Sequence, residues 1–118
     1  MIDNKESDRL LELVLAALDD MKAVDVRVID VRDLTSITDR MVIASGTSTR
    51  HVKALAEHVV GQAKQRGYKP LGVEGETTAE WVLVDLADVV VHVMMPEIRE
   101  FYALEKLWSV GGRNNASA

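Results

Sequence analysis

Three histidines, His51, His58 and His92, are the side chains best suited to acid–base or metal chemistry. His51 and His58 share a helical face but lie about 10 Å apart along its axis, too far for one metal ion without a further ligand. No H-E-x-x-H motif is present, and no cysteine can complete a zinc site. We therefore expect packing or surface roles for both, and no metal or cofactor.

A hydroxyl group near His51 could form a nucleophile–base pair, since Ser45 and Thr47 are close to it in the sequence. No G-x-S-x-G motif supports that interpretation. Gly46 and the hydroxyl residues after it lie between a strand-like and a helical segment, where free backbone N–H groups can bind phosphate. The stretch matches neither common phosphate-loop motif, so a plain helix cap is the simpler interpretation.

Paired carboxylates are the remaining candidates for chemistry. Asp85 and Asp88 flank a short connection and could bind a divalent cation, although aspartate is favoured in hairpin loops for turn geometry alone. Glu74 and Glu76 have the spacing of one strand face, but no third carboxylate or base completes a site. These patterns do not require an enzyme, and we expect no catalytic residues.

Length and composition indicate one acidic domain. The chain has 118 residues, of which 47% are hydrophobic, enough for a core, and no cysteine for a disulfide framework. Its net charge of −5 argues against a general nucleic-acid binder but permits a basic protein partner. No apolar run could span a membrane, and the polar N-terminus does not resemble a targeting signal. We expect a cytoplasmic protein with a domain over residues 1–110 and a short disordered tail over 111–118.

Apolar residues at helical spacing predict three helices. They cover residues 7–22, 48–66 and 97–108. Ser7 is the expected N-cap of the first helix, and Thr47 or Ser48 that of the second. Gly67 follows the second helix at the position where a positive φ is most easily adopted.

Valine-rich segments predict five strands. They cover residues 26–31, 41–45, 70–73, 81–84 and 89–95. The second strand is short and wholly apolar, so it should be central, whereas Pro70 places the third at an edge. The resulting order α-β-β-α-β-β-β-α predicts a mixed sheet in a single α/β (α+β) domain.

The last two strands should form an antiparallel hairpin in which Val84 lies opposite Val89. Alternation of side chains puts only valines on one face, which is the expected core face. The other face carries Trp81, Leu83, Val90, His92 and Met94. If that face is open, it marks a partner site, whereas helices on both faces would make it a second core layer.

Six short motifs in a fixed order resemble one known family. They are SITD at 36–39, GTSTRHV at 46–52, LGVEG at 71–75, WVLVD at 81–85, VVVHVM at 89–94 and YALEKLW at 102–108. Each motif alone is weak, but their order and spacing together are specific. The chain resembles the ribosomal silencing factor family, RsfS or Iojap-like, over about residues 7–108.

The resemblance implies a nucleotidyltransferase-like fold without catalytic residues. In a chain this short we expect helices mainly on one face of the sheet. The resemblance also implies binding to the large ribosomal subunit through large-subunit protein fourteen, which blocks joining of the small subunit. Translation would then be repressed in starvation or stationary phase. The family further implies a homodimer when the protein is free. From the acidic charge and the lack of a long apolar run we expect no specific nucleic-acid partner and no membrane.

The open face and the matched motifs together suggest a partner site anchored by Trp81, because aromatic residues dominate interface energetics. The full predicted set is Trp81, Leu83, His92, Met94, Gly75 and Glu76, the last two shaping the entry loop. His51 and Tyr102 also match the family pattern, without an assigned role. Two alternatives remain open at this point: a nucleotidyltransferase-like enzyme and a generic dimerisation module.

Overall fold

The computed structural model describes residues 5–102 of the chain, and side chains up to residue 100. Its elements follow the predicted order, which is thereby confirmed. They are α1 Lys5–Asp20, β1 Val24–Asp30, β2 Arg40–Ser45, α2 Thr49–Gln65, β3 Gly72–Glu74, β4 Trp81–Asp85, β5 Val89–Met94 and α3 Pro96–Tyr102. The rest of the predicted last helix, the 110/111 boundary and the predicted tail lie outside the described residues.

The strands form one five-stranded mixed sheet in the order β1-β2-β5-β4-β3. Strands β2 and β5 are parallel, and every other neighbouring pair is antiparallel. The predicted mixed sheet is therefore confirmed, with β2 inside it and β3 at an edge. In the described part of the chain, no helix is long and apolar enough to cross a membrane.

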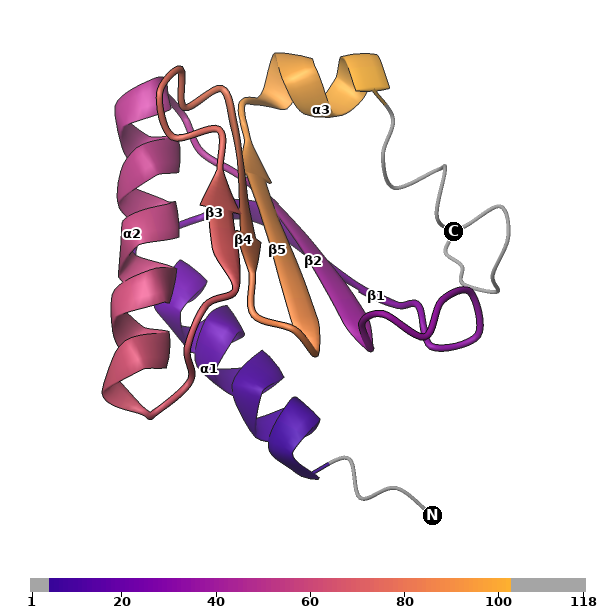
Figure 1. Cartoon of the computed structure of the whole chain (residues 1–118). Coiled ribbons are helices and arrows are strands. Elements are labelled where there is room, and N and C mark those ends of the chain that lie inside the picture. Colours follow the sequence, from indigo (N-terminus) through magenta and orange to yellow (C-terminus); the bar gives the residue numbers. More distant parts are fainter. Residues whose placement is uncertain (1–4, 103–118) are drawn as a thin grey trace.

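Helices α1 and α2 lie side by side on one face of the sheet (Figure 1). Their apolar stripes pack on the inward-facing valines of the sheet, which form the main core. The fully buried members include Val14 and Leu18 of α1, Leu55 and Val59 of α2, and Val82, Val84, Val91 and Val93 of the hairpin. The prediction of an all-valine core face is confirmed.

The second face of the sheet carries a smaller apolar cluster, formed by Ile29, Val31, Met41, Ile43 and Met94. Trp81 of β4 and Ile98 of α3 pack against it. Helix α3 lies beyond the end of β5, in the upper part of Figure 1. The second face is therefore neither a bare surface nor a full second core: its buried centre has a half-buried rim.

The hairpin register differs from the predicted one. Val84 pairs with Val91, not with Val89, because the turn takes only two residues. The Leu86 N–H donates to the Val89 carbonyl at 3.0 Å, and Ala87 adopts a positive φ of 75°. The shift is two residues, an even number, so both faces keep their predicted members.

Helix α1 begins earlier than predicted, which makes the assignment of Ser7 as its N-cap wrong. Ser7 lies inside the helix with 3% of its surface exposed, and its hydroxyl has no hydrogen-bond partner. The second helix follows the prediction, since the Ser48 hydroxyl accepts from the His51 N–H at 3.1 Å. Gly67 follows that helix with a φ of 89°, as expected.

Candidate partner-binding site

The indole of Trp81 and the ring of His92 are joined by a hydrogen bond on the second face. Trp81 Nε1 donates to His92 Nδ1 at 3.0 Å, and the ring centroids are 5.9 Å apart at an interplanar angle of 49°. The pairing of β4 with β5 brings them together, because Leu83 lies opposite His92 and Trp81 opposite Met94. The two rings are thus diagonal neighbours across an antiparallel ladder, within reach of each other.

His92 is held as a neutral ring. It is 6% exposed, between its register partners Leu83 on β4 and Ile43 on β2. This burial lowers the pKa of His92 from 6.5 to about 4. Because an indole N–H can only donate, Nδ1 must be the acceptor, and the ring proton lies on Nε2.

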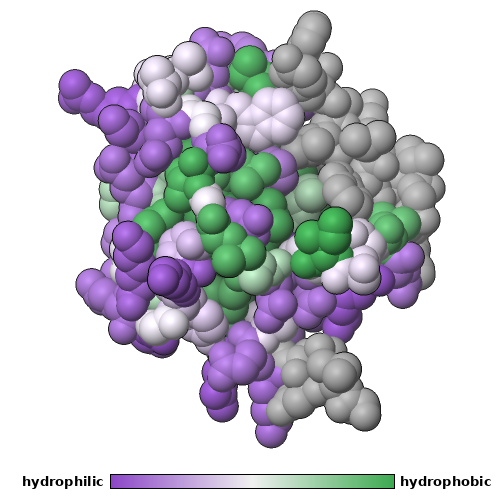
Figure 2. Space-filling view, in the orientation of Figure 1, coloured by the Kyte–Doolittle hydropathy of each residue, from purple (hydrophilic) through white to green (hydrophobic). Residues whose placement is uncertain are grey.

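The predicted site residues fall into an accessible and a buried group. Trp81, Leu83 and Val90 are half-buried, and we call these three residues the Trp81 patch. His92 and Met94 are buried beside and beneath it, so they support the surface more than they form it. In Figure 2, hydrophobic side chains gather over the middle of the sheet, with hydrophilic ones around them.

The loop that enters β4 lies against the backbone of Trp81. Gly75 has a φ of 90°, and a Cβ on it would lie 2.1 Å from the Trp81 carbonyl oxygen. The Gly75 carbonyl accepts from the Ala79 N–H at 3.0 Å, which closes the loop. Glu76 is exposed on the same loop. The structure therefore places Gly75 against the Trp81 backbone, with Glu76 at the next position of the loop, while their role in binding stays a prediction.

His51 connects two helices. Its Nδ1 accepts from the Thr47 N–H at 2.9 Å, and its Nε2 donates to the Met21 carbonyl at 2.8 Å. The Thr47 hydroxyl also lies 3.2 Å from Nδ1, but that lone pair already accepts the backbone N–H. Ser45 is not brought to His51, since its buried hydroxyl accepts from Arg99 Nη1 at 2.9 Å. The arrangement explains His51 as a structural tie.

Two further candidates for chemistry, His58 and Asp85, have hydrogen-bond partners within the fold. His58 Nε2 lies 3.2 Å from Asp20 Oδ2, between α2 and α1. An Asp85 carboxylate oxygen accepts from the Ala87 N–H at 2.9 Å, which is the turn role considered for it. Over residues 5–102, no group of three or more histidine, aspartate or glutamate side chains could hold a metal ion.

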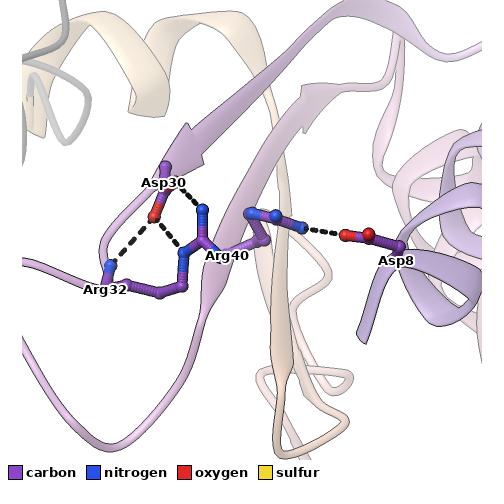
Figure 3. Close-up of polar contacts among 4 residues, drawn as sticks. All are labelled: Asp8, Asp30, Arg32 and Arg40. Carbon is purple, nitrogen blue, oxygen red and sulfur yellow. Dashed lines mark hydrogen bonds and ion pairs between the residues drawn. The ribbon is translucent and has the colours of Figure 1, made fainter. Parts of the chain in front are cut away.

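Sequence reasoning missed several polar contacts, two of which are drawn in Figure 3. The Arg32 guanidinium beside Asp30 lowers the pKa of that carboxyl to about 2, and an i, i+2 pair of this kind could have been anticipated. Asp8 of α1 receives a hydrogen bond from Arg40 of β2 at 3.2 Å. The sequence carried no signal for that pair, 32 residues apart, nor for burial of Arg99.

Comparisons with known proteins agree on one family. The family model described as ribosomal silencing factor during starvation matches residues 4–117. Over 100 residues the chain is 44% identical to the ribosomal silencing factor RsfS of Haemophilus influenzae, covering 85% of this chain and 98% of the relative. The mouse protein named mitochondrial assembly of ribosomal large subunit protein 1 is 38% identical over 103 residues, covering 85% of this chain and 45% of the mouse protein.

A crystal structure of a Chromobacterium violaceum protein has a similar fold. It superposes with a TM-score of 0.85 at 44% identity, covering 94% of this chain and 91% of the other. The fold, the length of the match and the level of identity all lead to the same assignment, which agrees with the resemblance of the six motifs. The chain belongs to the ribosomal silencing factor family.

Proposed function

We propose that the protein binds the large ribosomal subunit through large-subunit protein fourteen and thereby blocks joining of the small subunit. Translation would fall in this way during starvation or stationary phase. Membership of the silencing family supports a role on the ribosome. The mouse relative, named for assembly of the mitochondrial ribosomal large subunit, favours that subunit as the target.

The observation that carries the proposal is the Trp81 patch on an acidic protein. A half-buried tryptophan with flanking Leu83 and Val90 gives an apolar centre of the kind that binds a partner. A net charge of −5 suits a basic ribosomal protein and would steer the encounter. His92 and Met94 would support the patch, and Gly75 and Glu76 would shape its margin.

The free protein would cover the same patch by forming a homodimer, since exposed apolar surface favours self-association. Its place of action would be the cytoplasm, with the ribosomes.

We assign it no enzymatic role: its effect would come from occupying a surface. Incubation with labelled ATP or GTP, magnesium and candidate acceptors should therefore give no transfer. Turnover that Asp85→Asn or Asp88→Asn abolishes would restore the enzyme alternative.

Replacement of the anchor tests the proposal. Trp81→Ala should weaken binding to purified large subunits about thirtyfold, or roughly 2 kcal/mol, as truncation of an interface anchor does. The measurement is co-sedimentation over a range of protein concentrations, with thermal melting of the same preparation. Leu71→Ala is the matched control, because Leu71 is an exposed hydrophobic residue, 70% accessible, outside the patch.

Two results would count against this site. Unchanged binding by Trp81→Ala would place the contact elsewhere on the protein. A loss of about 3–5 kcal/mol in folding stability would mean that Trp81 is a core residue rather than an anchor.

A further inference from the structure

The hydrogen bond between Trp81 and His92 lies within the proposed binding surface. We infer that His92 is a positioning residue for the partner: its Nδ1 holds the Trp81 indole in the orientation in which it docks. The inference rests on the proposed function, in which Trp81 is the anchor. It assigns to His92 an action through the indole, distinct from direct contact with the ribosome.

Accessibility separates the two rings. His92 is 6% exposed, whereas Trp81 is half-buried and can be reached from solvent. A partner on this face would therefore touch the indole far more than the imidazole. An effect of His92 on binding is then expected to pass through a neighbouring side chain, and the 3.0 Å bond from Trp81 Nε1 is a directional contact that can transmit it.

The imidazole itself is firmly placed. It lies on β5, the central strand of the sheet, between Leu83 of β4 and Ile43 of β2. Trp81, by contrast, is the first residue of β4, where the strand leaves a loop. A fixed acceptor on a central strand can thus orient a bulky side chain at a strand end.

Orienting the indole before binding should raise affinity. A side chain that is free in solution loses rotamer freedom when it docks, which weakens binding by up to about tenfold. If folding has already fixed the indole, this loss does not recur on the ribosome. The ring of His92 is neutral near pH 7, so its Nδ1 lone pair is available for that bond.

Three substitutions of His92 separate the effect of the hydrogen-bond acceptor on the indole from the effect of side-chain size. In His92→Asn, the amide oxygen takes the place of Nδ1 and can still accept the indole N–H. In His92→Gln the oxygen lies farther out, and His92→Leu has no acceptor at all. Binding to purified large subunits should weaken up to about tenfold in the Leu and Gln variants and recover in the Asn variant.

A second readout follows the indole directly. The Nε1–H resonance of Trp81, assigned with Trp81→Phe, should exchange faster with solvent in His92→Leu than in the wild type. It should be protected again in His92→Asn. In a Trp81→Phe background, which has no N–H to hold, His92→Leu should cause no further loss of affinity.

The outcomes distinguish this inference from the proposed function. If Trp81→Ala binds normally, the proposed site is wrong, whatever His92 does. If Trp81→Ala loses binding while His92→Leu binds like the wild type, only the positioning role is wrong. An equal loss from His92→Leu in the wild-type and Trp81→Phe backgrounds would also overturn it. Should His92→Leu fail to fold, the Asn and Gln variants carry the comparison.

Discussion

Gly75 and the carbonyl of Trp81 are in closer backbone contact than any side chain would permit. A Cβ at this position would lie 2.1 Å from that oxygen, and the φ of 90° is rare for other residues. The glycine thus fixes how the loop meets the start of β4. The backbone of Trp81 can lie at this position because residue 75 has no side chain.

Gly75→Ala should therefore destabilise the fold by more than a change of φ alone. Gly67 is the matched control, since its φ is 89° and a Cβ there would meet nothing within 4 Å. We expect Gly67→Ala to lower the free energy of unfolding by about 1–2 kcal/mol and Gly75→Ala by about 1–3 kcal/mol more. Urea denaturation of both variants measures the difference, and equal losses would refute the clash.

His92 should make the stability of the protein depend on pH. The unfolded chain takes up a proton near pH 6.5, whereas the folded chain does so only near pH 4. Stability from this group is complete above pH 6.5 and should fall, by as much as about 3 kcal/mol, as the pH drops toward 4. The pH profile of unfolding for His92→Asn should lack this component, and identical profiles would contradict the burial of an uncharged ring.

At the scale of elements, helix α2 is tied to α1 at its start by His51. One ring nitrogen accepts from the loop before α2, and the other donates to the Met21 carbonyl after α1. The contact spans 30 residues of sequence. It therefore fixes the start of α2 relative to the end of α1.

His51→Ala should remove both bonds and lower the free energy of unfolding by about 1–2 kcal/mol. His58→Ala on the same helix is the control. Its bond to Asp20 is a surface contact with the aspartate side chain 62% exposed, so we expect a change within about 0.5 kcal/mol. Chemical denaturation of the two variants measures both changes in the free energy of unfolding. Similar losses would show that His51 does not tie the helices.

The elements could be predicted because their signals are local. Valine runs, apolar periodicity, the Ser48 cap and Gly67 all act over a few residues. The hairpin register could not be predicted, because it depends on a two-residue turn in which Ala87 adopts a φ of 75°. Alanine is not a typical turn residue, so the sequence gives no signal for this turn. The Ser7 error has a similar origin, since a serine near a helix start suits a cap or a first turn.

The candidate site was predictable only in part. Alternation along β4 and β5 placed Trp81, Leu83 and His92 on one face, as the pairing of the strands bears out. The burial of His92 and Met94 depends on packing around the second apolar cluster, which no local pattern reports. Nor did the sequence reveal the Trp81–His92 bond, because it requires the actual register and rotamers.

At the scale of the whole molecule, the two faces of the sheet have different tasks. One is covered by α1 and α2 over β4 and β5 and supplies the core (Figure 1). The other carries the Trp81 patch beside a smaller cluster. Both edge strands are poorly suited to pair with a strand of another chain. Strand β3 has only three residues, and β1 has an irregularity near Asp25, whose φ is 55°. The proposed binding surface is thus a face of the sheet, not an edge.

A protein that acts by covering a surface should inhibit stoichiometrically. Separated large and small subunits are mixed with increasing protein, and their joining is followed by light scattering. Inhibition should saturate near one protein per large subunit once concentrations exceed the dissociation constant. It should be relieved when the protein is removed, and it should weaken with a large excess of small subunits, which compete for the same face.

Trp81→Ala serves as the matched control, since it should need a proportionally higher concentration for the same inhibition. Full inhibition by a small fraction of an equivalent, persisting after the protein is removed, would indicate covalent modification of the ribosome and contradict the steric mechanism. Tight binding without inhibition would place the contact away from the surface where the subunits join. Saturation at one equivalent with full reversal is the outcome that surface occupation by a rigid sheet face requires.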